Sequence, residues 1–182
     1  MSIFLNLLAI MRLTTILAVL FTTTGFAYPS ANTTYVGPTK GHLVIVGGNL
    51  KSEVIWNRII TLAGGPSAPI VVIPTAGGEP SYDADFPAAV TLRQLGATNV
   101  TVLHTYDPDV ADTDAFVEPL LSAKGIFFGG GRQWRLVDAY AGTKAEKAFQ
   151  AVLDRGGVIS GSSAGASIIG ACEMVHMVID LG

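Results

Sequence analysis

The chain has 182 residues and a formal net charge of −3; 49% of its residues are hydrophobic and 14% are charged. This length and apolar content are sufficient for one domain with a packed core. The absence of a basic tract argues against a nucleic acid or a membrane surface as a partner. A single cysteine, Cys172, excludes an internal disulfide, so the domain depends on its core for stability.

Residues 1–27 are predicted to be a secretory signal peptide that is cleaved after Ala27. An uncharged run extends from Leu13 to Phe26 and follows Arg12. Met11 opens a better-proportioned signal, so it is an alternative start of translation. The run is shorter than the roughly 20 residues that span a bilayer, which favours cleavage over an uncleaved anchor. We therefore expect a secreted, extracellular protein with no membrane contact after cleavage.

Two triplets in the chain fit the acceptor pattern for N-linked glycosylation. Asn32 lies in Asn-Thr-Thr, within a polar lead-in at residues 28–40, and Asn99 lies in Asn-Val-Thr. Such triplets also arise by chance, but they agree with secretion. We expect glycosylation at both asparagines.

From residue 41 onward, short apolar runs alternate with longer amphipathic stretches. The short runs indicate buried strands and the longer stretches indicate helices. The expected strands are His42–Val46, Ile70–Ile73, Val100–His104, Gly125–Phe128 and Val158–Ser160. The expected helices are 52–63, 84–95, 112–121 and 133–153, the last broken near Gly142. This alternation predicts an α/β fold with a mainly parallel sheet covered on both faces.

Glycine-rich or turn-forming segments follow four of these five strands. In a parallel sheet, functional groups lie just beyond the carboxyl ends of the strands. Tight strand-to-helix turns also need glycine for structural reasons. Four such loops on one edge nevertheless favour a functional site there. The segments are Gly47-Gly48-Asn49, residues 74–79, residues 129–133 and Gly161-Ser162-Ser163.

Ser163 is the candidate nucleophile. A serine hydroxyl attacks efficiently only when it is exposed beside a base and faces N–H donors. Gly161 and Gly165 flank Ser163 at the Gly-x-Ser-x-Gly spacing, which is typical of a sharp strand-to-helix elbow. A helix beginning at Ser163 would direct its N-terminus, including the Ala164 N–H, at a developing oxyanion. The alternative is a structural turn in which Ser162 or Ser163 caps a helix.

Four segments also carry a family resemblance, and they occur in the same order along the chain. These are Gly-Ser-Ser-Ala-Gly-Ala at 161–166, residues 126–133, residues 41–48, and Ile-Pro-Thr-Ala at 73–76. They resemble the cyanophycinase and peptidase E group of serine peptidases, family S51. The resemblance implies a three-layer αβα sandwich, flavodoxin-like and related to class I glutamine amidotransferases.

The resemblance also implies an activity and assigns roles to residues. It implies a serine exopeptidase that cleaves aspartyl or β-aspartyl bonds of a peptide substrate, with no metal or other cofactor. Ser163 would be the nucleophile, and the N–H groups of Ala164 and the Gly130–Gly131 turn would form the oxyanion hole. Gln133 would contact the substrate; a solvated glutamine in the first turn of a helix is the alternative.

Two residues depart from the family pattern. Arg132 stands where Asn or Asp is more common, and Asn49 stands where an acidic residue commonly follows the first Gly-Gly. Either departure could alter substrate preference.

The family's catalytic histidine and its acidic partner lie well downstream of the nucleophile, whereas 19 residues (182 − 163) follow Ser163 here. We therefore expect residues 41–170 to be a truncated domain of this type, and 171–182 to be an atypical tail. His176 would lie about 20 Å away along a continuous helix. Without a base, only a small part of the catalysis remains, so we expect weak or no activity.

The other two histidines are also poor candidates for the base. His42 begins a strand and so lies at the opposite edge of the sheet. His104 is expected at the active edge, near Asp107 and Asp109, but a satisfied strand-end histidine is the favoured interpretation.

Two other functions remain open from the sequence. An α/β-hydrolase esterase shares Gly-x-Ser-x-Gly, although the glycine loop at 129–131 lies only about 30 residues before the serine and His-Gly-Gly-Gly is absent. A non-catalytic secreted domain that binds peptides is the other alternative. The sequence also leaves open a homodimer.

Overall fold

The computed structural model of the chain describes residues 40–170. The predicted signal peptide, the lead-in with Asn32, and the tail with His176 lie outside these described residues. The fold below therefore concerns the domain that follows the lead-in.

Strands and helices alternate along the described chain. Their order is β1 (His42–Val46), α2 (Glu53–Ala63), β2 (Ile70–Ile73), the 3-10 helix η1 (Thr75–Gly77), α3 (Pro87–Gln94), β3 (Val100–Val102), α4 (Pro108–Ala111), α5 (Asp114–Ser122), β4 (Gly125–Phe128), α6 (Gln133–Tyr140), α7 (Lys144–Asp154) and β5 (Val158–Ser162). Helical backbone follows β5 over residues 164–170. All five expected strands and all the expected helical regions are present.

Some boundaries differ from the expected ones for identifiable reasons. β3 ends at Val102 rather than at His104, because its partner β2 ends at Ile73 and turns into η1. β5 continues to Ser162, because β1 extends as far: Val46 of β1 pairs with Ser162. The long connection after β3 contains two helices, because the chain has two N-cap residues there.

Two side-chain caps divide the segment between β3 and β4. The Asp107 carboxylate accepts a hydrogen bond from the Asp109 N–H and starts α4. The Thr113 hydroxyl accepts from the Phe116 N–H and starts α5. Such caps satisfy N–H groups that have no partner within the helix. The single helix expected over 112–121 is therefore α5 alone, preceded by a separate short helix.

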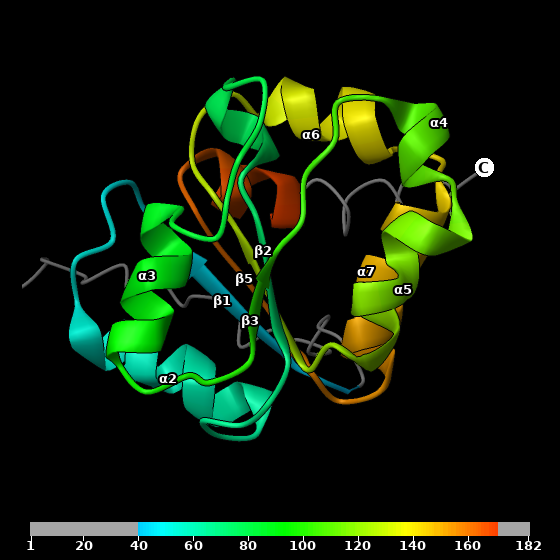
Figure 1. Cartoon of the computed structure of the whole chain (residues 1–182). Helices are drawn as coiled ribbons and strands as arrows, with labels where there is room; N and C mark the ends of the chain where they lie inside the picture. Colours follow the sequence, from blue (N-terminus) through cyan, green and yellow to red (C-terminus); the bar gives the residue numbers. More distant parts are fainter. Residues whose placement is uncertain (1–39, 171–182) are drawn as a thin grey trace, which may run out of the picture. The chain divides into compact units, whose positions relative to one another are not determined.

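The strands form one parallel sheet with the order β1-β5-β4-β2-β3 (Figure 1). Without β1, the order is that of the first four strands of a flavodoxin-like sheet, 2-1-3-4. β1 comes first in the chain but lies at the edge of the sheet, beside β5. This order puts β5 next to both β1 and β4, so the loops after these three strands are neighbours.

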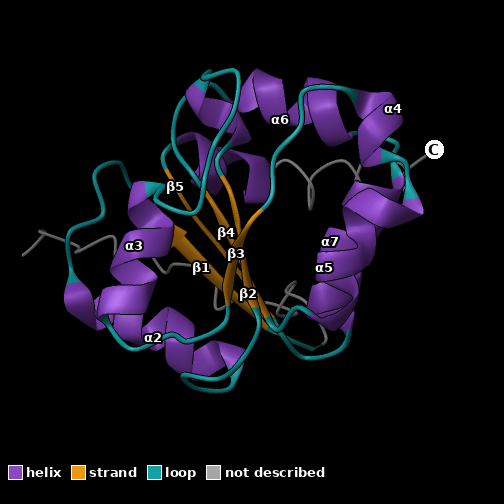
Figure 2. Cartoon of the chain, in the orientation of Figure 1, coloured by secondary structure: helices purple, strands orange, loops and turns teal. Residues whose placement is uncertain are grey.

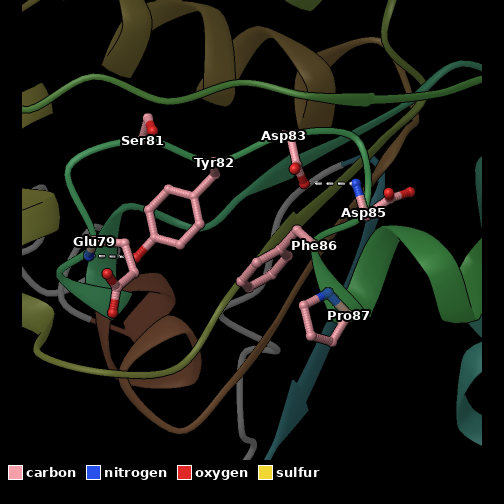
Figure 3. A pocket seen from close by; sticks show the side chains of 7 residues that line it. All are labelled: Glu79, Ser81, Tyr82, Asp83, Asp85, Phe86 and Pro87. Carbon is pink, nitrogen blue, oxygen red and sulfur yellow. Dashed lines mark hydrogen bonds between the residues drawn. The ribbon is translucent and has the colours of Figure 1, made fainter.

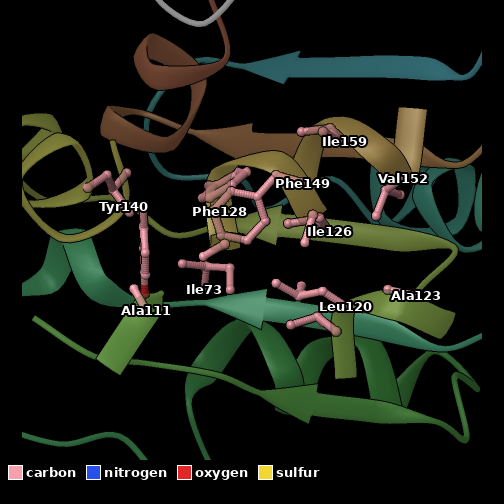
Figure 4. Close-up of a cluster of buried hydrophobic side chains, with 14 of the residues drawn as sticks. Ile73, Ala111, Leu120, Ala123, Ile126, Phe128, Tyr140, Phe149, Val152 and Ile159 are labelled. Carbon is pink, nitrogen blue, oxygen red and sulfur yellow. The ribbon is translucent and has the colours of Figure 1, made fainter. Parts of the chain in front are cut away.

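Helices cover both faces of the sheet, giving the expected three-layer αβα arrangement (Figure 2). Alternate residues of a strand point to opposite faces. In β2, Ile73 (Figure 4) and Val71 pack into the core under α5 and α7, whereas Ile70 and Val72 pack into the core under α2 and α3. Because β2 and β4 each supply side chains to both cores, these two strands are apolar throughout.

The packing predicts that two adjacent leucines of α5 contribute very differently to the free energy of unfolding. Leu120 is 0% exposed and belongs to the core under α5 and α7, whereas Leu121 is 66% exposed. We expect Leu120→Ala to lower the free energy of unfolding by about 2–5 kcal/mol, because it leaves a cavity. Leu121→Ala, the matched control, should change it by less than about 0.5 kcal/mol. Urea denaturation of both variants measures this, and equal losses would contradict the described packing.

Candidate functional site

The loops after β1, β4 and β5 meet at the carboxyl edge of the sheet. Their strands are in register there, since Val46 pairs with Ser162 and Phe128 pairs with Gly161. A Cβ atom placed on Gly130 would lie 3.4 Å from the Ser163 Cβ and 3.9 Å from its Oγ; one placed on Gly48 would lie 4.0 Å from that Cβ. Ser163 is therefore flanked by two glycine loops with no side chains to cover it.

Ser163 has the backbone geometry of a sharp elbow. Its φ is 56°, a left-handed conformation that is uncommon for residues other than glycine. Its N–H donates to the Val46 carbonyl at 3.2 Å, and its own carbonyl accepts from the N–H groups of Ala166 and Ser167. The helix begins at residue 164, one residue later than expected, because Ser163 itself makes the turn. The Ser163 side chain is exposed.

The glycines on either side explain why the elbow can be so tight. A Cβ atom on Gly165 would overlap the Phe128 carbonyl, and one on Gly161 would overlap the backbone of Gly165. The helix after the elbow therefore packs directly on β4 and β5. This close approach is the physical reason for the Gly-x-Ser-x-Gly spacing in this chain.

The structure also separates Ser163 from its neighbouring serines. The Ser162 hydroxyl is buried and donates to the Gly47 carbonyl at 2.8 Å, so it ties β5 to the loop after β1. The Ser160 hydroxyl is fully buried and donates to the Ile126 carbonyl. Ser163 differs from both in being exposed beside the glycine loops.

Backbone N–H groups with no carbonyl partner lie in the segments that adjoin Ser163. Within residues 40–170, the N–H groups of Gly130, Gly131 and Ala164 donate to no backbone carbonyl. Ala164 is 4% exposed and opens the helix after the elbow. Unpaired N–H groups at a helix N-terminus attract negative charge. These segments therefore offer donors to an anion that forms on the exposed side of Ser163.

Three polar residues predicted to affect substrate binding lie on the flanking loops. Arg132 and Gln133 are exposed at the start of α6, directly after the Gly130–Gly131 turn. Asn49 is exposed, follows Gly48, and has a left-handed φ of 60°. Asn49 and Ser163 are the two non-glycine residues with positive φ in the described part of the chain, and both lie at this edge.

The described histidines do not reach Ser163. His42 begins β1 at the opposite edge, where its N–H donates to the Gly157 carbonyl. His104 follows β3, which is three strands from β5, a separation of about 14 Å at about 4.8 Å per strand. Its Nδ1 is 2.9 Å from the Thr75 hydroxyl, and Asp107 caps α4 instead of pairing with it. His104 therefore lies away from Ser163, as the sequence favoured, but it is not fully satisfied: its buried Nε2 has no hydrogen-bond partner within residues 40–170.

The sequence did not indicate the polar cluster that surrounds His104. Thr75 is fully buried, and its hydroxyl contacts both His104 and the Tyr140 hydroxyl, 65 residues away. Tyr82 and Tyr106 contact the His104 ring edge-on. In the sequence, the one signal for this cluster was that Thr75 lies in a loop directly after β2.

An acidic loop borders the glycine turn after β4. Residues 79–87 line a hollow (Figure 3), in which the Tyr82 hydroxyl accepts from the Glu79 N–H at 3.0 Å. Phe86 packs against Gly129, so that a Cβ on this glycine would lie 3.2 Å from the Phe86 ring. The hollow thus adjoins the loop that flanks Ser163. Its lining residues are Glu79, Ser81, Tyr82, Asp83, Asp85, Phe86 and Pro87.

Residues 40–170 contain neither a metal-binding cluster nor a membrane-spanning helix. In this range, no group of three or more His, Cys, Asp or Glu side chains is placed to hold a metal ion. Across the same residues, no helix is long and apolar enough to cross a bilayer.

Comparison with known proteins places this geometry in a family. The family model described as peptidase family S51 matches residues 43–180. A cyanophycinase from Geminocystis herdmanii is 28% identical over 135 residues, which are 72% of this chain and 49% of that protein. A cyanophycinase from Synechococcus elongatus is 30% identical over 149 residues, 79% of this chain and 46% of that protein.

A solved structure agrees with the sequence comparisons. The crystal structure of a peptidase from an acI-B1 actinobacterium superposes with a TM-score of 0.60 at 27% identity, covering 71% of this chain and 56% of that one. The chain spans about half the length of the curated relatives it matches. Since the family model covers most of the chain and one relative is 30% identical over 79% of it, the chain belongs to peptidase family S51.

Proposed function

We propose that the chain carries the nucleophilic half of a serine-type peptidase site, with Ser163 as the nucleophile. The observation that carries this proposal is the exposed, left-handed Ser163 between the Gly48 and Gly130 loops. This geometry presents the hydroxyl to a substrate. Ser162 and Ser160, by contrast, use their hydroxyls to join loops and strands.

In the proposed reaction the Ser163 Oγ attacks a peptide carbonyl carbon and its proton passes to water, with no metal ion required. The tetrahedral intermediate then breaks its C–N bond and expels the protonated amine, and water hydrolyses the resulting acyl-serine ester. Before the C–N bond breaks, the carbonyl oxygen is an oxyanion. Within residues 40–170, the N–H groups of Ala164 and of the Gly130–Gly131 turn have no carbonyl partner and are available to it. One such donor is typically worth about 3–4 kcal/mol of transition-state stabilisation, or about 100–1000-fold in rate.

We propose aspartyl or β-aspartyl peptides as the substrate class. Two relatives in peptidase family S51 are named cyanophycinase, which supports a hydrolase of this general kind. Arg132 supports an acidic substrate, because its exposed guanidinium adjoins the Gly130–Gly131 turn and no carboxylate within residues 40–170 pairs with it. Gln133 and Asn49 offer uncharged hydrogen-bonding groups on either side.

We further propose that the 182-residue polypeptide hydrolyses its substrate slowly by itself. Neither histidine of residues 40–170 reaches Ser163, so these residues supply no histidine base. A serine site without its base keeps only the contribution of the oxyanion hole and of substrate binding.

Secretion and glycosylation form a separate part of the proposal. Asn99 is exposed and lies just before β3, at the amino edge of the sheet. Ser163 lies at the carboxyl edge. A glycan on Asn99 would therefore leave the proposed site open.

The role of Ser163 is tested by covalent labelling. We expect the purified chain to react slowly with a fluorophosphonate probe, and Ser163→Ala to abolish this labelling. Ser167→Ala is the matched control, because Ser167 is also exposed and lies one turn along the same helix. It should label like the wild type. Labelling that persists in Ser163→Ala would sink the assignment.

Peptide hydrolysis tests the substrate class and the slow rate. We expect the chain to cleave a β-aspartyl dipeptide slowly but measurably, and Ser163→Ala to lose this activity. A chain that cleaves p-nitrophenyl esters and no aspartyl peptide would contradict the peptidase proposal. Fast turnover that depends on Ser163 would contradict only the proposed lack of a base.

The elbow packing makes a prediction that links structure to reactivity. Gly165→Ala should push the helix away from Phe128 and cost about 1–3 kcal/mol of unfolding free energy, as overpacking does. It should also reduce labelling of Ser163. Gly47→Ala is the control, because a Cβ there meets no atom within 4 Å. Equal labelling of the two variants would show that the elbow does not control reactivity.

Glycosylation is tested by secretion from eukaryotic cells. We expect peptide N-glycosidase to reduce the mass of the secreted chain, and Thr101→Ala to remove the Asn99 share of this change. Thr101→Ser keeps the acceptor triplet and should keep the glycan. An unmodified Asn99 in the secreted wild type would refute this part of the proposal.

A further inference from the structure

A buried row of hydrogen bonds joins three residues that are far apart in the sequence. The Thr75 hydroxyl lies 2.9 Å from the His104 Nδ1 and 2.6 Å from the Tyr140 hydroxyl. Thr75 is 0% exposed and Tyr140 is 4% exposed. No residue in this row contacts Ser163, so the proposed chemistry does not explain it.

The direction of the hydrogen bonds follows from the available acceptors. Burial raises the pKa of Tyr140 to about 12, so its hydroxyl keeps its proton and is a donor in this row. The Tyr140 O–H therefore donates to Thr75, and Thr75 donates to the His104 Nδ1. The ring proton is then on Nε2, which has no hydrogen-bond partner within residues 40–170.

The surroundings of His104 favour its neutral form. Burial lowers its pKa, and the Pro80 carbonyl opposes this only in part. Tyr82 and Tyr106 contact the ring edge-on, with centroid distances of 4.8 and 4.5 Å. The titratable or charged groups around it are thus Tyr82, Tyr106 and Tyr140, with Arg135 of α6 acting on Tyr106. None of them is a carboxylate that would stabilise an imidazolium.

The same row connects directly to the glycine turn beside Ser163. Thr75 begins η1, whose next residue, Ala76, accepts hydrogen bonds at its carbonyl from the Arg132 N–H at 2.8 Å and from the Arg135 side chain at 3.0 Å. Gly131 packs so closely on this carbonyl that no Cβ fits. Tyr140 is the last residue of α6. η1 therefore holds α6 at both ends, through Ala76 at its start and Thr75 at its end.

We propose that His104 is a positioning residue for the Gly130–Gly131 turn. Its unprotonated Nδ1 orients the Thr75 hydroxyl, which holds Tyr140 and keeps α6 and the turn in place beside Ser163. The importance of the turn for catalysis rests on the proposed function; the positioning itself does not. The hydrogen-bond row is thus a support for the oxyanion donors, built from residues outside the site.

The proposal has a definite pH dependence. Protonated His104 would carry a proton on Nδ1, facing the hydroxyl proton of Thr75, so the row would have to reverse. Because burial lowers the pKa of His104 below its ordinary value of 6.5, folding disfavours the charged form. The support is fully present above that ordinary value, and it is lost as the pH falls through the lowered one.

NMR spectroscopy of the full chain tests the proposal without any turnover. Above about pH 7, the His104 ring should be the neutral tautomer with its proton on Nε2. On acidification, the amide signals of Gly130 and Gly131 should shift with the same midpoint as the His104 ring, below the ordinary histidine value. His104→Asn retains an acceptor near Nδ1 but does not titrate, so these amide shifts should disappear. His42→Asn, at the opposite edge, should leave them unchanged.

Thr75 provides the second pair of variants. Thr75→Val should displace the Gly130 and Gly131 amide signals at neutral pH, whereas Thr75→Ser, which keeps the hydroxyl, should restore them. A proton on Nδ1 of the neutral ring, or glycine shifts that persist in His104→Asn, would overturn the proposal. If Thr75→Val does not fold, two measurements still test the proposal: the tautomer of His104 in the wild type, and the Gly130 and Gly131 amide shifts in His104→Asn. A failure of Ser163 labelling would leave them unaffected, so the two proposals fail separately.

Discussion

The contact between the elbow helix and the central sheet is the constraint on which the site depends. Gly165 sits against the Phe128 carbonyl and Gly161 against the backbone of Gly165, so no side chain can separate helix from sheet. To leave β5 at this distance, the chain must turn within one residue, and Ser163 takes the left-handed conformation that this requires. Exposure of its hydroxyl is a consequence of packing on the buried side.

Sheet order decides which groups can act on that hydroxyl. β5 lies between β1 and β4, so the glycine loops of those two strands flank Ser163. β3 lies three strands away, which puts His104 out of reach although it follows a strand at the same edge. The family model of peptidase S51 matches residues 43–180, which contain the elbow and its glycine loops, and the matched segments are 49% and 46% of the two cyanophycinases.

The switch point of the sheet, between β2 and β4, contributes support rather than a reactive group. Ligands commonly bind where connections leave neighbouring strands in opposite directions. Here η1 after β2 packs against the turn after β4, with the Ala76 carbonyl bonded to the Arg132 N–H. The Thr75 hydroxyl is hydrogen-bonded on both sides, to His104 and to Tyr140, and so joins three segments of the chain.

The strands, most helices, the two covered faces and the prominence of Ser163 could be predicted from the sequence, because those signals are local. Apolar runs mark β2 and β4, and the Gly-x-Ser-x-Gly spacing marks the elbow. Tertiary structure decided the strand order, the burial of Ser162 against Gly47, and the bonds of Thr75 to His104 and Tyr140. These contacts join residues 29 to 115 positions apart, and local pattern carries no information on which distant segments pair.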